Sequence, residues 1–231
     1  MKSKTPFIII LLVLAVAIGG AWYLKKAATS QGHGAISNRT PASNTTPPPA
    51  TAGVNGAEPP HTLGPTSAKV HLEEFGDFEC PPCGLLHPIL QQMQTEFSDR
   101  LQITFREFPL VPTHQHAMAA ASAAEAAALQ GKFWEMHDLL YEHQKDWHEV
   151  FDVRPIFEGY AKQIGLDVER YKRDVNSDPV ADRIIQDGKR GHYLGVKGTP
   201  TVFLNGREVP FESLPADKLR VLINSELSGS K

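Results

Sequence analysis

The stretch Glu74-Phe75-Gly76-Asp77-Phe78-Glu79-Cys80-Pro81-Pro82-Cys83 contains both cysteines of the 231-residue chain. A disulfide that acts as a structural staple usually joins residues far apart in sequence, because closing a long loop removes more entropy from the unfolded chain. A loop of only two residues removes little. The spacing of Cys80 and Cys83 therefore indicates reversible thiol chemistry and not a stabilising crosslink.

The residues around the cysteines predict a strand that leads into a helix. Residues 70–78 form a strand-like apolar run, and residues 84–97 carry apolar side chains on one helical side. Cys80 then falls at about the N-cap, Cys83 lies one turn further on, and Pro81 takes the first helical position, where its missing N–H costs nothing. A helix N-terminus lowers the pKa of a thiol, and the thiolate is the reactive form. This pattern predicts that Cys80 exchanges disulfides with substrate and that Cys83 resolves the mixed disulfide.

The segments that follow predict an α/β domain over residues 68–228. A strand at 101–108 closes a parallel strand–helix–strand unit. After it come helical segments at 117–129, 132–141, 156–164, 168–175 and 180–194, a strand at 201–204, the hairpin turn Asn205-Gly206 and a helix at 215–227. The first of these helices is alanine-rich, and Asp167 is the expected N-cap of the segment at 168–175. We expect a small mixed sheet with a helical insertion at about 113–194.

Two motifs resemble those of the DsbA-like thioredoxin-fold proteins. The first is the cysteine stretch, and the second is Gly198-Thr199-Pro200-Thr201-Val202-Phe203-Leu204-Asn205-Gly206. The resemblance covers roughly residues 66–227 and implies a thioredoxin-like α/β fold with a helical insertion, in which Pro200 is cis and faces the cysteines. It further implies that Thr199 modulates redox behaviour. The family also has an acidic residue at Glu74, which would exchange protons with the resolving thiol.

Other interpretations of these residues stay open. Pro200 can simply begin a strand, and Glu74 can be a surface glutamate like its neighbour Glu73. The cysteine pair can be half of a zinc site, but zinc takes four ligands and the chain has no second cysteine pair. His114 and His116 can complete such a site; we expect them to be solvated residues at a helix start. We also expect His87 to be packed or solvent-facing, so we predict no metal and no cofactor.

The direction of electron flow depends on Pro82. DsbA-type oxidants resemble this chain at Pro81 but have histidine in place of Pro82, whereas thioredoxin itself has proline there. Pro82 offers neither an imidazole nor an N–H to the sulfur of Cys80, so we hypothesise a weaker oxidant than a Cys-Pro-His-Cys enzyme. The resemblance favours an enzyme that oxidises thiols of secreted or envelope proteins and is re-oxidised by a quinone-linked membrane partner. A thiol reductase or isomerase is the alternative, as is a tethered metal-binding or chaperone module.

The N-terminus predicts a membrane anchor. Residues 7–24 are apolar and uncharged, with lysines on both sides. At ~1.5 Å per residue they form a helix about 27 Å long, enough to cross a thin hydrocarbon core. We predict a transmembrane signal-anchor here with residues 1–6 in the cytoplasm; a cleaved signal is the alternative, because Ala15-Val16-Ala17 resembles a cleavage site. Both place the rest of the chain on the periplasmic or cell-surface side.

The segment between anchor and domain has the composition of a linker. Residues 27–67 are rich in Ala, Ser, Thr, Asn, Gly and Pro and have no apolar periodicity. Such a segment cannot bury enough apolar surface to offset its ordering entropy, so we predict a disordered linker. The formal net charge of the chain is -3, which leaves no excess of Lys and Arg to bind phosphates. We therefore expect protein thiols and the membrane, and no nucleic acid, as partners.

Overall fold

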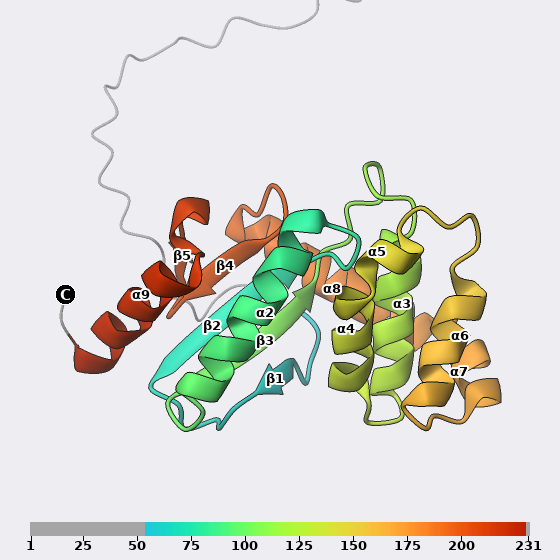
Figure 1. The fold of residues 1–231 in the computed structure, drawn as a ribbon, viewed down its shortest axis with the longest axis horizontal. Helices are drawn as coiled ribbons and strands as arrows, with labels where there is room; N and C mark the ends of the chain where they lie inside the picture. The colour runs from blue at the N-terminus through green and yellow to red at the C-terminus, as the bar shows by residue number, and fades with distance from the viewer. Residues whose placement is uncertain (1–53, 230–231) are drawn as a thin grey trace, which may run out of the picture. The chain divides into compact units, whose positions relative to one another are not determined.

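The computed structural model describes residues 54–229, in which a five-stranded mixed sheet carries helices on both faces (Figure 1). The strands are β1 (His61–Leu63), β2 (Val70–Gly76), β3 (Leu101–Glu107), β4 (Thr201–Leu204) and β5 (Arg207–Val209). Their spatial order is β1-β3-β2-β4-β5. The central pair β2 and β3 is parallel, and the other neighbours are antiparallel. The predicted mixed sheet is confirmed.

The helices follow the predicted order. They are α2 (Pro81–Glu96), α3 (Ala117–Ala128), α4 (Phe133–Glu142), α5 (Gln144–Trp147), α6 (Arg154–Gln163), α7 (Val168–Asp174), α8 (Asp178–Leu194) and α9 (Ala216–Ser228), with a 3₁₀ turn η1 at Phe211–Ser213. Helices α3 to α8 lie between β3 and β4 in the chain, which confirms the helical insertion. The short elements β1, α5 and η1 were not predicted, because so few residues carry no readable periodicity.

Alternation along β2 determines which side chains face which layer. Val70 and Leu72 pack in one apolar cluster with α2 and α9, whereas Phe75 packs on the opposite face with Phe108 and Phe203. Because successive side chains of a strand point to opposite faces, Glu74 faces the α2 side with Val70 and Leu72.

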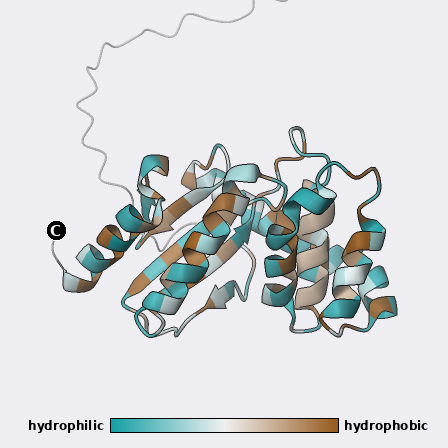
Figure 2. Ribbon diagram, in the orientation of Figure 1, coloured by the Kyte–Doolittle hydropathy of each residue, from teal (hydrophilic) through white to brown (hydrophobic). Residues whose placement is uncertain are grey.

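Helix α3 is the centre of the insertion. Its sequence is mostly alanine, so it is coloured toward the apolar end of the scale along its length (Figure 2). It contacts α4, α6, α7 and α8. Small side chains let neighbouring helices approach on several sides, and this explains why an alanine run is buried here.

Two predicted local signals are confirmed by the backbone. Asn205 and Gly206 have φ values of 48° and 77°, as a two-residue hairpin turn requires, and β4 and β5 pair across it. Asp167 caps α7, since its carboxylate accepts a hydrogen bond from the N–H of Arg170 at 2.9 Å.

The predicted linker boundary at residue 67 is wrong, because residues 54–67 are part of the domain. β1 pairs with β3, the N–H of Ala57 donates to Asp187 at 2.7 Å, and Arg106 donates to the carbonyl of Ala57 at 2.8 Å. Asp187 and Arg106 are buried polar groups that need partners, and this segment supplies them from its backbone. Composition cannot reveal that role, because backbone atoms provide the bonds.

The predicted anchor at 7–24 and linker residues 27–53 lie outside the described residues. Among the helices of residues 54–229, none combines the length and apolar character that crossing a bilayer requires.

Candidate active site

The two cysteines lie at the N-terminus of α2 as predicted. Cys80 is the N-cap residue, with an extended backbone at φ -70° and ψ 119°, and Cys83 lies in the first turn. Both are free thiols, 3.5 Å apart. Cys80 keeps 3% of its surface exposed and Cys83 keeps none, so only Cys80 can meet a substrate sulfur without rearrangement.

The two thiols differ in acidity. The hydrogen bond from the Cys83 thiol is the main cause that lowers the pKa of Cys80 from 9.0 to about 6; burial opposes the shift, and Thr199 adds to it. Burial raises the pKa of Cys83 well above its usual value, and its hydrogen bond to Cys80 adds to that rise. At neutral pH Cys80 is therefore the thiolate and Cys83 the thiol.

The first turn of α2 offers few N–H groups to the thiolate. Pro81 and Pro82 occupy its first two positions and have no N–H. The N–H of Cys83 hydrogen-bonds the sulfur of Cys80, and the N–H of Gly84 donates to the carbonyl of Cys80 at 3.2 Å. The thiolate thus depends on its neighbour Cys83 more than on the helix terminus.

Asp77 holds the loop before Cys80 in place. Its carboxylate accepts the N–H of Glu79 through Oδ1 and the N–H of Leu110 through Oδ2, both at 2.8 Å, and its own carbonyl accepts the N–H of Cys80 at 3.1 Å. Asp77 is not among the residues predicted from the sequence. An aspartate directly after a strand can accept a hydrogen bond from the backbone N–H two residues on, and this Asx-turn signal would have identified it.

Gln144 of α5 fixes the same loop from the helical insertion. Its side-chain amide donates to the carbonyl of Phe78 at 2.7 Å and to that of Cys80 at 2.9 Å. Gly84 makes room for it, because a Cβ at Gly84 would lie 2.7 Å from Oε1 of Gln144. No sequence signal points to Gln144, since it lies more than sixty residues from the cysteines.

The prediction that His114 and His116 are solvated is wrong. Nδ1 of His114 lies 2.8 Å from Oδ2 of Asp77, and His116 is buried with its N–H donating to Glu79 at 2.5 Å. The acidic residues of the active-site loop draw the start of α3 against it. Within residues 54–229 the cysteines belong to no cluster of three or more metal-binding side chains, so the zinc half-site alternative is not supported.

Thr199 and Pro200 lie beside the cysteines, as the resemblance implies. The Thr199–Pro200 peptide bond is cis. Sγ of Cys80 lies 3.2 Å from the carbonyl oxygen of Thr199, to which it donates a hydrogen bond when it carries its proton. The backbone just before β4 thus lies beside the sulfur of Cys80, where an extended substrate would have to bind.

Glu74 is buried, whereas its neighbour Glu73 is paired with arginines. Burial is the main cause that raises the pKa of Glu74 from 4.5 to about 8, and the negative charge of Cys80 adds to it. Burial also acts on Glu73, but hydrogen bonds from Arg190 and Arg106 outweigh it and lower that pKa. Glu74 is therefore the protonated member of the pair at neutral pH.

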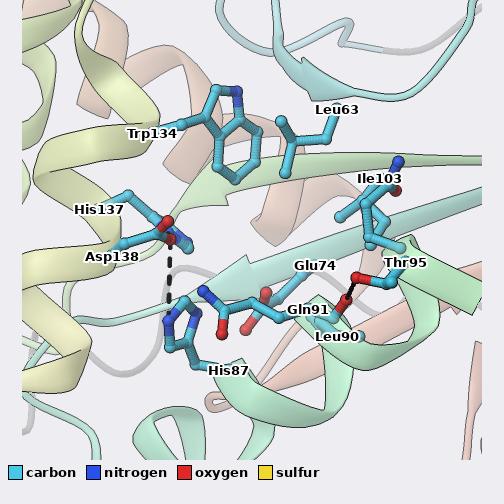
Figure 3. Close-up of a pocket in the computed structure, with 11 residues that line it drawn as sticks. Leu63, Glu74, His87, Leu90, Gln91, Thr95, Ile103, Trp134, His137 and Asp138 are labelled. Atoms are coloured by element: carbon cyan, nitrogen blue, oxygen red, sulfur yellow. Dashed lines mark hydrogen bonds and ion pairs between the residues drawn. The ribbon is translucent and has the colours of Figure 1, made fainter. Parts of the chain in front are cut away.

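A cavity of about 350 Å³ opens beside Glu74, between α2 and α4 (Figure 3). His87 of α2 lines it with Trp134, His137 and Asp138 of α4. His87 is 6% exposed, so the packed alternative is correct for it and the solvent-facing one is not. Within the described residues, Oε1 of Glu74 has no hydrogen-bond partner.

Comparison with known families places the chain. A family model described as thioredoxin matches residues 57–225. Over 172 residues the chain is 38% identical to the Na(+)/H(+) antiporter NhaA 1 of Salinispora arenicola (strain CNS-205). This alignment covers 74% of this chain and 25% of that protein. It is 40% identical over 147 residues to NhaA 3 of Salinispora tropica, and that alignment covers 64% of this chain and 22% of the relative. The chain thus spans about a quarter of the length of these relatives, and the name of each relative refers to its full length.

Solved structures share the fold. BdbD from Bacillus subtilis in its oxidised form superimposes with a TM-score of 0.65 at 24% identity, covering 74% of this chain and 94% of that chain. A thioredoxin-like oxidoreductase from Silicibacter pomeroyi DSS-3 gives 0.58 at 25% identity, covering 71% and 92%. The thiol-disulfide exchange protein α-DsbA2 from Wolbachia pipientis gives 0.60 at 19% identity, covering 72% and 86%. The chain therefore belongs to the thioredoxin family and has the fold that BdbD and α-DsbA2 share.

Proposed function

We propose that this protein oxidises thiols of secreted or envelope proteins through a Cys80–Cys83 disulfide, outside the cytoplasm. The observation that carries the proposal is the asymmetry of the pair. Cys80 is partly accessible with a pKa of about 6, whereas Cys83 is fully buried with a raised pKa. The sulfur of Cys80 is therefore suited to form the mixed disulfide with substrate and to act as its leaving group. The sulfur of Cys83 is suited to form the internal disulfide with Cys80.

The reaction begins from the disulfide form. A substrate thiolate attacks Sγ of Cys80, the Cys80–Cys83 bond breaks, and Cys83 leaves with the electron pair and takes up a proton. A second substrate thiolate then attacks the substrate sulfur of the mixed disulfide, and Cys80 leaves as a thiolate. Its low pKa makes it a good leaving group. Two electrons pass to the enzyme, and a quinone-linked membrane partner would remove them.

Glu74 is the proposed proton donor to Cys83. With a pKa of about 8 it holds a proton at neutral pH, and its charge interacts with that of Cys83. Forming a buried thiolate at Cys83 costs free energy. A proton donor nearby therefore makes it easier for the sulfur of Cys83 to leave the disulfide. Thr199 and the cis Pro200 would align the substrate backbone beside Cys80.

The N-terminal sequence supports the proposed location. The apolar run at 7–24 would tether the domain to the membrane, and the linker would let it reach substrates on the outer side. Fractionation of cells that express the full chain tests this: the protein should remain in the membrane after a salt wash. A variant that lacks residues 7–24 should not.

Trapping tests the catalytic roles. A Cys83→Ser variant should accumulate mixed disulfides between Cys80 and substrate proteins in the native envelope, because the resolving thiol is missing. Cys80→Ser is the matched control and should trap none. Equal trapping by both variants would contradict the assignment of Cys80 as the attacking residue.

The direction of electron flow needs its own measurement. As an oxidase, the purified disulfide form should form disulfides in a reduced, unfolded protein at a rate that Cys80→Ser abolishes. If the protein instead reduces insulin readily but fails to oxidise thiols, the reductase alternative is the correct one.

A further inference from the structure

We propose that His87, His137 and Asp138 form a binding site for a divalent transition metal of the zinc class, separate from the cysteines. One ligand atom from each side chain lies within 4.8 Å of the other two. His87 comes from α2, and His137 and Asp138 come from α4, so the site joins the active-site helix to the helical insertion (Figure 3). This inference goes beyond the thiol chemistry and does not depend on it.

The distances suit a small metal ion. Oδ1 of Asp138 lies 3.7 Å from Nε2 of His87 and 3.0 Å from Nδ1 of His137. Nitrogen and oxygen ligands bind zinc at ~2.0–2.2 Å, which places tetrahedral neighbours roughly 3.2–3.6 Å apart. The two distances to Asp138 lie near this range, and all three ligand atoms lie within 4.8 Å of one another, so binding one ion requires shifts of roughly 1 Å.

One nitrogen of each imidazole ring is unsatisfied. Both His87 and His137 are more than nine-tenths buried, and among the described residues Nε2 of each has no hydrogen-bond partner. Nδ1 of His137 is hydrogen-bonded to Oδ1 of Asp138 at 3.0 Å, a bond that a shared metal ion would replace. In Figure 3 the ring of His87 points from α2 toward Asp138. Buried polar atoms without partners are rare, and a missing ion is one of the ordinary explanations.

The kinds of side chain match those that bind zinc-class metals. Imidazole nitrogens and a carboxylate oxygen are usual protein ligands of such ions. Asp138, whose side chain is 40% exposed, supplies the negative charge and a path from solvent.

The cavity leaves room for a fourth ligand. Its volume of about 350 Å³ accommodates water, and Glu74 lines it as well. Three protein ligands with an open position filled by water are an established zinc arrangement. Imidazole and carboxylate ligands also accept Cu²⁺ and Ni²⁺, so the chemistry selects a class of metal and not one element.

Titration with Co²⁺ and Zn²⁺ tests the site in the full chain carrying Cys80→Ser and Cys83→Ser, which removes the thiol ligands. We expect one Co²⁺ per chain with the visible absorption bands of a tetrahedral nitrogen–oxygen site, displaced by Zn²⁺. His87→Gln and Asp138→Asn should each weaken binding by more than about 100-fold, because even indirect partners of a metal ligand contribute 10–100-fold.

The matched control is His143→Gln, at the residue between α4 and α5. Nδ1 of His143 lies 2.9 Å from Oδ2 of Asp146, a similar histidine–carboxylate pair on the surface, but the two belong to no three-ligand cluster within residues 54–229. This variant should bind Co²⁺ as the parent does. Absence of stoichiometric binding in the parent, or unchanged binding in Asp138→Asn, would overturn the proposal. Circular dichroism identifies a misfolded variant. If His87→Gln unfolds, Asp138→Asn still tests the proposal, because the side chain of Asp138 is 40% exposed and its substitution disturbs the core less.

Discussion

We expect the reduction potential of the cysteine pair to depend on Pro82. It leaves the second position of α2 without an N–H, so Cys80 is stabilised mainly by Cys83. In thiol–disulfide chemistry, a more stable thiolate makes the disulfide form a stronger oxidant. A substitution at Pro82 should therefore change the potential of the pair.

Replacing Pro82 with histidine should make the protein more oxidising. Pro82→His adds an N–H and an imidazole near Cys80, so the pKa of Cys80 should fall below 6 and the reduction potential should rise. The rise should be about 30 mV for each pKa unit. Equilibration with glutathione measures it. Pro88→Ala, which removes the proline inside the same helix, should leave the potential unchanged; an unchanged potential in Pro82→His would refute the role of Pro82.

Glu74 should make the reduced protein less stable as pH rises. Its pKa is about 8 in the folded chain and 4.5 otherwise, so its favourable contribution is complete below pH 4.5 and is lost as pH rises through 8. Glu74→Gln stays neutral and should therefore be more stable than the wild type by on the order of 3 kcal/mol at pH 7, with no gain at pH 4. Urea unfolding at both pH values measures the difference.

The neighbouring Glu73 provides the control for this prediction. Its carboxylate binds Arg106 and Arg190, and its pKa is lowered. Glu73→Gln should therefore destabilise the protein at pH 7. If Glu73→Gln and Glu74→Gln changed the free energy of unfolding at pH 7 in the same direction, the assignment of opposite pKa shifts to the two glutamates would be wrong.

At the scale of elements, the active-site loop is held by contacts from other parts of the chain. β2 and α2 place Cys80, but α5 and the start of α3 hold the residues before it through Gln144 and the N–H of His116. The helical insertion is thus part of the active site and not only a cover over the sheet.

Removing the Gln144 side chain tests this role. Gln144→Ala removes the side-chain donor to the carbonyl of Phe78 and leaves the carbonyl of Cys80 with the N–H of Gly84 as its donor. We therefore expect a loss of about 1–3 kcal/mol in stability and slower thiol exchange. Gln130→Ala is the control, because Gln130 makes two hydrogen bonds to the backbone of Asp167 on the surface. Thermal unfolding and alkylation rates should change clearly only for Gln144→Ala. Equal effects would contradict a specific role for α5.

At the scale of the whole molecule, the domain begins before residue 61. The backbone at Ala57, Glu58 and Pro59 binds side chains of β3 and α8, and β1 covers the edge of β3. All five strands, both cysteines and the metal-site residues lie within the described residues 54–229.

Two truncations test this boundary. A chain that starts at residue 54 should unfold cooperatively and keep the thiol reactivity of the full protein. A chain that starts at residue 68 should lose several kcal/mol, because Asp187 and Arg106 lose buried partners at about 1–3 kcal/mol each. Comparable stability of the two chains would show that residues 54–67 are dispensable.

Much of the fold was readable from sequence because its signals are local. Strand alternation, the alanine-rich helix, the Asn205-Gly206 turn and the Asp167 cap each depend on neighbouring residues, and all are found in the structure. The placement of Cys80 at a helix N-cap follows from the same local rules. Backbone geometry and periodicity act over a few residues, so one sequence is enough to show them.

The sequence by itself determined the cysteine pair, its place at the N-terminus of α2 and the α/β order of the chain. Only the tertiary structure decided that Glu74 and not Glu73 is buried, that Gln144 holds the loop, that residues 54–67 belong to the domain, and that His87 meets His137 and Asp138. Each of these depends on contacts between segments distant in sequence. Such contacts arise from how elements pack in space. Apolar periodicity shows which face of an element is buried, but it does not show which distant residues that face meets.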